Sequence, residues 1–155
     1  MIINQRARLK MTNMELIKKL RDSTGSGIVD CKKALSENNN DLDAAVKWLR
    51  EKGILKAQKK QDRDTNEGVI SLYNHSISYS SFTICKIKCE TDFVAKNEDF
   101  LLFANDLTKS IHESLNIKKE GVIEDLNGLK LGDKDINTAL TDLISKIGEN
   151  IQIIS

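Results

Sequence analysis

The spacing of apolar residues changes along this chain. Between residues 14 and 53, apolar residues recur three and four positions apart, which is typical of helices that bury one face. Gly25, Gly27 and a run of asparagines at 38–40 interrupt this spacing, because these residues favour turns. The pattern therefore predicts three short helices at residues 15–22, 28–37 and 42–52, with Gly53 ending the third.

Residues 54–66 are rich in lysine and glutamine. The four basic residues Lys56, Lys59, Lys60 and Arg63 are typical of a solvated helix face, so we expect a short linker helix here. An RNA-binding role for these lysines is disfavoured, because no aromatic platform accompanies them.

Further along, the apolar residues alternate with polar ones, as they do in strands. The runs 69–73 and 82–89 are separated by a polar stretch and together predict a hairpin. Alternation places Cys85, Ile87 and Cys89 on the core face and the lysines between them in solvent.

Helical spacing returns after Asn97, which is a good N-cap. A second helix is expected at about 134–147, and a strand begins at 151–154. The apolar stripe of the first helix consists of Phe100, Ala104, Leu107 and Ile111.

The expected fold class is α+β. A three-helix bundle and a linker helix precede a core made of an antiparallel hairpin and two packed helices. We expect an extension at 1–13, the bundle at 14–53, the linker at 54–66 and the core at 67–155.

Composition narrows the range of functions. The net charge is +1, so the chain lacks the global field that favours nucleic acid or an acidic membrane. No apolar run approaches the roughly 20 residues that a membrane-spanning helix needs. Residues 1–13 are too short and too weakly apolar for a secretory signal. We expect a cytoplasmic protein, or one of an organelle matrix if residues 1–13 belong to a transit peptide.

The three cysteines are interpreted as reduced, buried thiols. Their odd number, without a secretory signal, favours an intracellular compartment. Cys85 and Cys89 lie four positions apart in a strand, about 13 Å by strand rise, which is too far for a disulfide. We expect no metal site and no cofactor.

Catalysis has little support in this sequence. His75 falls in the hairpin turn and His112 on a polar helix face, and neither has an indicated serine or cysteine partner. The turn at Gly25 and Gly27 lacks the remaining residues of a dinucleotide or Walker loop. The sequence therefore predicts a protein that is not an enzyme.

The segment from Thr91 to Asn97 is the strongest candidate site. It places Asp92 beside Phe93 in a short connection between a strand and a helix. A carboxylate next to an apolar ring suits insertion into another protein, because the acid can compete for a cation while the ring wedges between side chains. The alternative is that Phe93 folds back onto its own core.

A second candidate surface lies at the start of the second helix. Val29 projects about 150° from the apolar stripe of that helix at 100° per residue. With Ile28 and the nearby Arg21, it forms a plausible interface, since arginine and packed apolar residues often carry contacts. An isolated exposed apolar residue is the alternative.

Five segments of this sequence resemble elongation factor Ts. They are the segments at residues 20–27, 30–35, 41–53, 89–97 and 146–151, in this order. The resemblance covers about residues 14 to 155.

This resemblance implies a ubiquitin-associated type of N-terminal bundle and a core that promotes guanine-nucleotide exchange on elongation factor Tu during translation. The partner would be bound both with GDP and without nucleotide. The segment Thr91, Asp92, Phe93, Val94 would contact it, with Asp92 and Phe93 beside its magnesium site. Arg21, Ile28 and Val29 would dock the bundle on a neighbouring helix.

The chain departs from the family at its end. Longer members continue past the Ile-Gly-Glu-Asn-Ile segment, where this chain has four more residues. We expect either a fragment or a shortened factor that completes its sheet as a homodimer. The alternative function is a binding-only helical module without exchange activity.

Overall fold

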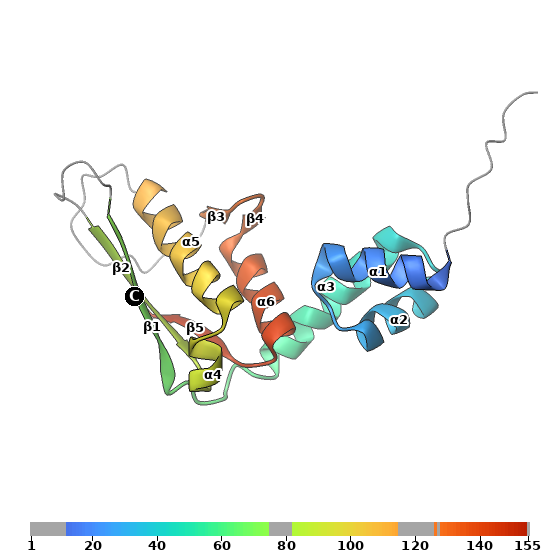
Figure 1. The fold of residues 1–155 in the computed structure, drawn as a ribbon, viewed down its shortest axis with the longest axis horizontal. Coiled ribbons are helices and arrows are strands. Elements are labelled where there is room, and N and C mark those ends of the chain that lie inside the picture. Colours follow the sequence, from blue (N-terminus) through green and yellow to red (C-terminus); the bar gives the residue numbers. More distant parts are fainter. Residues whose placement is uncertain (1–11, 75–81, 115–125, 127, 155) are drawn as a thin grey trace, which may run out of the picture. The chain divides into compact units, whose positions relative to one another are not determined.

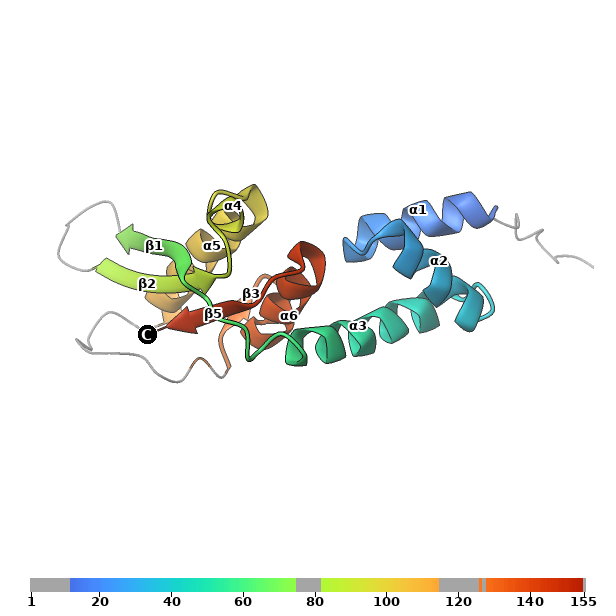
Figure 2. The same ribbon diagram turned by 90° about the horizontal axis from the view of Figure 1, so that it is seen from below.

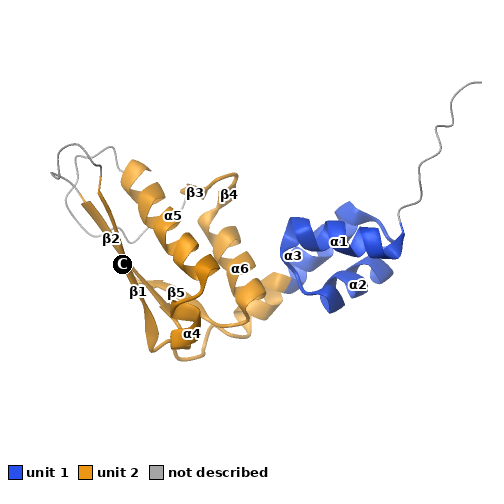
Figure 3. Cartoon of the chain, in the orientation of Figure 1, with its two compact units in different colours: residues 1–52 blue, residues 53–155 orange. Residues whose placement is uncertain are grey.

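A computed structural model gives the fold of residues 12–74, 82–114, 126 and 128–154 (Figure 1). The chain divides into two compact units, residues 1–52 and residues 53–155 (Figure 3). Each unit has its own cluster of buried apolar residues.

Unit 1 is built from α1 (Asn13–Thr24), α2 (Ile28–Glu37) and the first part of α3 (Leu42–Gln58), as predicted from the helical spacing. Figure 2 shows α2 connecting α1 to the start of α3. Thr12 begins α1 through a capping box with Glu15. The side chains that join the three helices are Leu20, Cys31, Ala34, Leu35, Ala45 and Leu49.

The prediction that Gly53 ends the third helix is wrong, because α3 continues through it to Gln58. A Cβ on Gly53 would lie 3.4 Å from Ser145 Oγ on α6 (Ile136–Ile147). At that distance an added Cβ would make ordinary van der Waals contact, so Gly53 lies where α3 approaches α6 and does not end the helix. The expected separate linker helix is instead the last part of α3, followed by turns.

Unit 2 is organised around an antiparallel sheet of β1 (Glu67–Asn74), β2 (Phe82–Cys89) and β5 (Ile151–Ile154), in the order β1-β2-β5. The helices α5 (Glu98–Ser114) and α6 lie over one face of this sheet (Figure 1). The remaining elements are the single turn α4 (Asp92–Ala95) and a two-stranded ribbon of β3 (Lys130–Leu131) and β4 (Lys134–Asp135). The α+β class and the hairpin are confirmed.

The core of unit 2 lies between the sheet and its helices. Cys85, Ile87 and Cys89 are buried on the helix-covered face, as the alternation predicts. Phe100 and Leu107 of α5 are both 0% exposed and pack into the same cluster. All three cysteines of the chain are buried and free.

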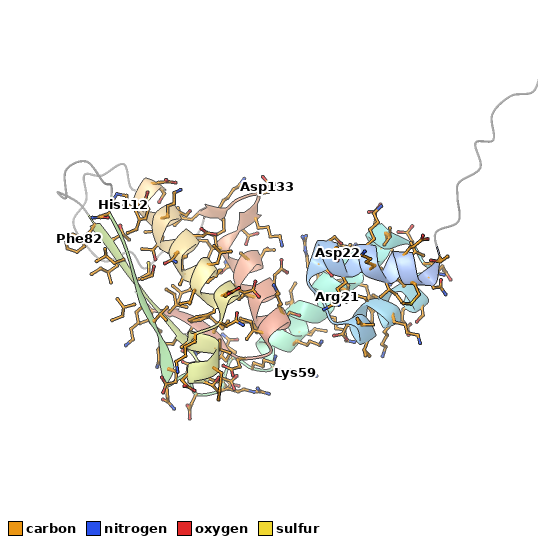
Figure 4. The ribbon with its side chains drawn as sticks, in the orientation of Figure 1. Arg21, Asp22, Lys59, Phe82, His112 and Asp133 are labelled. Atoms are coloured by element: carbon orange, nitrogen blue, oxygen red, sulfur yellow. The ribbon has the colours of Figure 1, made fainter. Side chains whose placement is uncertain are left out.

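The opposite face of the sheet, here called the outer sheet face, carries the apolar residues Ile70, Leu72, Phe82 and Ile84. These side chains are 54–72% exposed. Leu72 and Ile84 are register partners on neighbouring strands, so their side chains lie side by side. Figure 4 shows Phe82 at the edge of this face, pointing away from α5. An exposed apolar patch of this kind is typical of a contact surface.

The expectation that His112 lies on a polar helix face is wrong. Its side chain is 4% exposed and its Nδ1 lies 3.0 Å from Thr83 Oγ1 on β2. Figure 4 shows His112 near the end of α5 beside the hairpin strands. At 100° per residue, position 112 falls in the same sector as Ala104 and Thr108, which the apolar stripe alone does not show. His75 lies outside the described residues.

Gly68 occupies a position that tolerates no side chain. Its φ is 154°, and a Cβ there would lie 2.2 Å from the carbonyl oxygen of Ile87. We expect Gly68→Ala to destabilise unit 2 by about 2–3 kcal/mol, because the two strands must separate locally. Urea denaturation followed by circular dichroism checks this. Glu67→Ala on the exposed neighbour should change stability by less than about 0.5 kcal/mol, and equal stability of both variants would contradict the prediction.

Candidate partner-binding site

A single helical turn presents the candidate residues of unit 2. β2 ends at Cys89, and Thr91 caps α4, with its hydroxyl 3.4 Å from the Val94 backbone N–H. Asn97 then begins α5, as predicted, by accepting a hydrogen bond from the Asp99 N–H at 2.9 Å. Two consecutive caps therefore fix the turn within seven residues of sequence.

The turn sends neighbouring side chains in opposite directions. Phe93 is 82% exposed, while Val94 is 8% exposed and belongs to the core of unit 2. The alternative in which Phe93 covers its own core is therefore wrong. Val94, expected at the partner contact, instead packs the turn onto the core. We call the exposed pair Asp92 and Phe93 the wedge.

Asp92 is ionised and held by its neighbour. Lys96 Nζ lies 2.9 Å from Asp92 Oδ2 across one turn, and both side chains are more than half exposed. The hydrogen bond from Lys96, together with its positive charge, lowers the pKa of Asp92 below its ordinary value of 3.8. The wedge thus carries a negative charge at neutral pH beside an exposed ring.

We expect Lys96→Met to raise the pKa of Asp92 toward its ordinary value, because it removes the main cause of the lowering. A carboxyl with a lowered pKa loses its ion pair only as the pH falls through that lowered value, so the pair is intact at neutral pH. An NMR titration of the Asp92 carboxyl carbon measures the change. Lys109→Met, which removes the partner of Glu113 on α5, is the control. An unchanged Asp92 titration in Lys96→Met would contradict the assignment.

Glu149 holds the start of the turn, and sequence reasoning missed it as a site residue. Its carboxylate accepts hydrogen bonds from the Glu90 and Thr91 backbone N–H groups and from the Thr91 hydroxyl. The segment 146–151 is a clear sequence signal. Its contact with Thr91 joins residues 58 positions apart, however, and no periodicity predicts such a pair.

The candidate residues of unit 1 lie around the turn between α1 and α2. Val29 is 81% exposed, as its position opposite the stripe predicts, and its neighbour Ile28 is 56% exposed. Arg21 is exposed on the last turn of α1 (Figure 4). Gly25 ends α1 in the left-handed conformation with φ 67°, which lets the chain reverse before Ile28.

The described residues offer neither a cluster of metal ligands nor a membrane-spanning helix. Across the ranges given above, no group of three or more histidine, cysteine or acidic side chains could hold a metal ion. Within those same ranges, the helices all fall short of the length and apolarity that crossing a membrane requires.

Two family models match this chain, one over each of the segments that carry a candidate surface. A family model described as Elongation factor TS matches residues 90–154, and one described as Elongation factor Ts, mitochondrial, N-terminal matches residues 2–60. A protein named Elongation factor Ts from Alkalilimnicola ehrlichii is 44% identical over 138 residues, 89% of this chain. The chain belongs to the elongation factor Ts family.

Other members of the elongation factor Ts family match similarly. The protein of that name from Clostridium perfringens strain SM101 is 43% identical over 144 residues, 92% of this chain. The one from Campylobacter hominis is 44% identical over 139 residues, 90% of this chain. The alignments cover 46%, 46% and 38% of the three relatives, so this chain spans less than half of their length.

Proposed function

We propose that this chain is a guanine-nucleotide exchange factor that binds elongation factor Tu with GDP, promotes GDP release and holds the nucleotide-free form during translation elongation. The observation that carries the proposal is the wedge: an 82% exposed phenylalanine beside an ionised carboxylate on a doubly capped turn. Membership of the elongation factor Ts family supports it. The chain would catalyse no chemical reaction, because GDP leaves unchanged.

The charge of Asp92 suits competition at a magnesium site. Magnesium bridges nucleotide phosphates to protein oxygens, so disturbing its ligands removes a large local stabilisation. Asp92 can leave Lys96 at little cost, since exposed ion pairs contribute only about 0–1 kcal/mol. The carboxylate is therefore free to take a new partner when the wedge enters a binding site.

The ring of Phe93 supplies the driving force for insertion. Burying about 150 Å² of aromatic surface is worth about 4 kcal/mol, or about a thousandfold in a rate constant. This is an upper figure, because association has its own costs. Other contacts must therefore hold the wedge in place. We assign that role to Arg21, Ile28 and Val29 of unit 1, which would dock on a neighbouring helix of the GTPase.

The test is release of a fluorescent GDP analogue from elongation factor Tu with and without this chain. We expect acceleration, and a reciprocal effect in which GDP weakens binding of the chain by the factor by which the chain weakens binding of GDP. Binding that leaves GDP affinity unchanged would reject exchange and favour the binding-only alternative. Titrating the chain against nucleotide-free and GDP-bound elongation factor Tu measures both affinities.

We further propose that the core forms a homodimer, through the outer sheet face rather than by completing the sheet at its edge. Two antiparallel sheets pack face to face about 10 Å apart when each offers apolar side chains, as Leu72 and Ile84 do here. We expect a concentration-dependent dimer in sedimentation velocity. Ile84→Lys should weaken it, because the new charge adds to that of Lys86 on the same face. A monomer at every concentration, or a dimer indifferent to Ile84→Lys, would reject this interface.

We propose that the chain acts in the compartment where its proposed partner takes part in translation. The cytoplasm is the expected compartment, and the word mitochondrial in one matching family description supports the organelle matrix as the alternative. Imaging the full chain with a C-terminal fluorescent tag in its source cells separates the two.

A further inference from the structure

We propose that Glu149 is a positioning residue that holds the wedge in its exposed orientation. This inference rests on the proposed function and extends it to a residue that does not itself face a partner. Glu149 is half-buried, behind the turn rather than on it. Its carboxylate contacts the strand end that leads into α4, whereas the wedge projects from α4 itself.

The geometry around Glu149 is that of a three-point clamp. Oε2 accepts from the backbone N–H groups of Glu90 at 3.2 Å and Thr91 at 3.0 Å. Oε1 accepts from the Thr91 hydroxyl at 2.7 Å. Charge-assisted hydrogen bonds are about twice as strong as neutral ones, and here one carboxylate takes three. Thr91 is therefore fixed through both its backbone and its side chain.

The Thr91 hydroxyl transmits this restraint to α4. A hydroxyl has one proton, and Thr91 donates it to Glu149. Its lone pair then accepts from the Val94 N–H at 3.4 Å, closing the N-terminal end of the turn. A four-residue helix is too short to be stable alone, so its caps and core contacts must hold it. Phe93 is 82% exposed, and its direction therefore depends on what holds Thr91 and Val94.

A second carboxylate, that of Glu90, forms a hydrogen bond in the opposite direction, from the end of β2 to the segment that holds Glu149. Glu90 Oε1 accepts from the Asn150 backbone N–H at 2.6 Å. The buried Asn150 side chain in turn donates to the backbone carbonyls of Gln61 at 3.2 Å and Arg63 at 2.8 Å. Three stretches of unit 2, distant in sequence, thus meet behind the wedge. Because Glu149 bonds to Glu90 and Glu90 bonds to Asn150, the position of the Glu149 backbone is itself restrained.

The conformation of Gly148 makes the contact geometrically accessible. It ends α6 in the left-handed region with φ 92°, and its N–H bonds to the Ile144 carbonyl at 2.9 Å. That reversal turns the chain from α6 into β5 and brings Glu149 to the end of β2, where Cys89 and Ile151 are register partners. The segment 146–151, which stands out in the sequence, is thereby explained as the support of the segment 89–97.

The experiment compares Glu149→Gln with Glu113→Gln. The first removes the charge at nearly constant shape, and the second does the same to an exposed carboxylate on α5. Amide hydrogen exchange by NMR should show faster exchange at Thr91 and Val94, by about tenfold, in Glu149→Gln only. Amides of the α5 core, such as that of Leu107, should be unchanged. This measurement needs no partner.

The functional readout uses elongation factor Tu loaded with the fluorescent GDP analogue. Glu149→Gln should reduce the acceleration of release about fivefold, and Glu113→Gln should not. In a Phe93→Ala background, Glu149→Gln should have little further effect, because residues that act through one another are not additive. Thr91→Val, which lacks the hydroxyl, should act like Glu149→Gln, and Thr91→Ser should restore the wild-type value.

The possible results separate the two proposals. Unchanged exchange at Thr91 and Val94, or an effect of Glu149→Gln that persists in full without Phe93, would overturn the positioning role. Wild-type chain that neither binds elongation factor Tu nor accelerates release would overturn the proposed function, and the positioning role with it. Faster amide exchange together with a Phe93-dependent loss of activity supports both.

Discussion

Phe93→Ala is expected to reduce the acceleration of GDP release from elongation factor Tu by about 30-fold or more. We assign Phe93 the role of a binding hot spot, and truncating a hot-spot residue costs about 2 kcal/mol or more, which corresponds to about 30-fold in rate or affinity. The ring is 82% exposed, so its loss should leave the stability of unit 2 unchanged. Stopped-flow release of a fluorescent GDP analogue measures the effect, and thermal denaturation verifies the fold.

Phe82→Ala is the matched control for this variant. Phe82 is also a strongly exposed phenylalanine of unit 2, at 64%. It begins β2, whereas the wedge follows the other end of that strand, about 23 Å away by strand rise. Because Phe82 lies on the outer sheet face, both variants are assayed at a concentration where they share one oligomeric state. Equal losses in the two variants would show that exposed aromatic surface in general, rather than the wedge, drives release.

Phe100→Ala, unlike Phe93→Ala, should act through stability and strongly destabilise unit 2. Phe100 is 0% exposed and packs in the core between the sheet and its helices. Replacing a buried phenylalanine by alanine costs about 3–5 kcal/mol, because the transfer energy is lost and a cavity remains. That is a large part of the roughly 5–15 kcal/mol by which a domain is stable. Urea denaturation followed by circular dichroism measures the loss.

Leu102→Ala on the same helix is the control, because it truncates an exposed side chain of α5 and so shows how much of the effect of Phe100→Ala is due to burial. Leu102 is 60% exposed, so its truncation should change stability by less than about 0.5 kcal/mol. Trp48, the only tryptophan of the chain, lies in unit 1, and its fluorescence reports that unit in the same titration. Phe100→Ala and Leu102→Ala chains of equal stability would contradict the position assigned to Phe100.

Local spacing was sufficient to predict much of this fold. The period of the apolar residues predicted the three N-terminal helices, the hairpin, α5 and α6, because each element buries one face. The spacing failed to predict the position of residues whose surroundings are formed by elements distant in the sequence. Glycine commonly ends a helix, but α3 continues through Gly53, where an added side chain would meet Ser145 of α6. Histidine is often exposed to solvent, but the side chain of His112 forms a hydrogen bond with Thr83 of β2.

The candidate site shows the same division. The exposure of Val29 followed from its position opposite a stripe, and that of Phe93 was expected from its place beside Asp92 in a short connection between a strand and a helix. The burial of Val94 and the role of Glu149 did not, because both depend on how the sheet closes. Glu149 reaches Thr91 only through the pairing of β2 with β5, and that pairing joins segments about 60 residues apart. Such contacts depend on the tertiary structure, and the local spacing of residues does not predict them.

The burial of the three cysteines also has a consequence for chemical labelling. Burial, reinforced by the carboxylates of Glu149 and Glu67, raises the pKa of the Cys89 thiol to about 11. Burial raises the pKa values of Cys31 and Cys85 too. At neutral pH the reactive thiolate of Cys89 is then about one part in ten thousand. A cysteine introduced at an exposed position beside Phe93 would therefore react with maleimide dyes or photo-crosslinkers while the three native cysteines stay unmodified. With the wedge itself intact, it would report which surface the wedge touches.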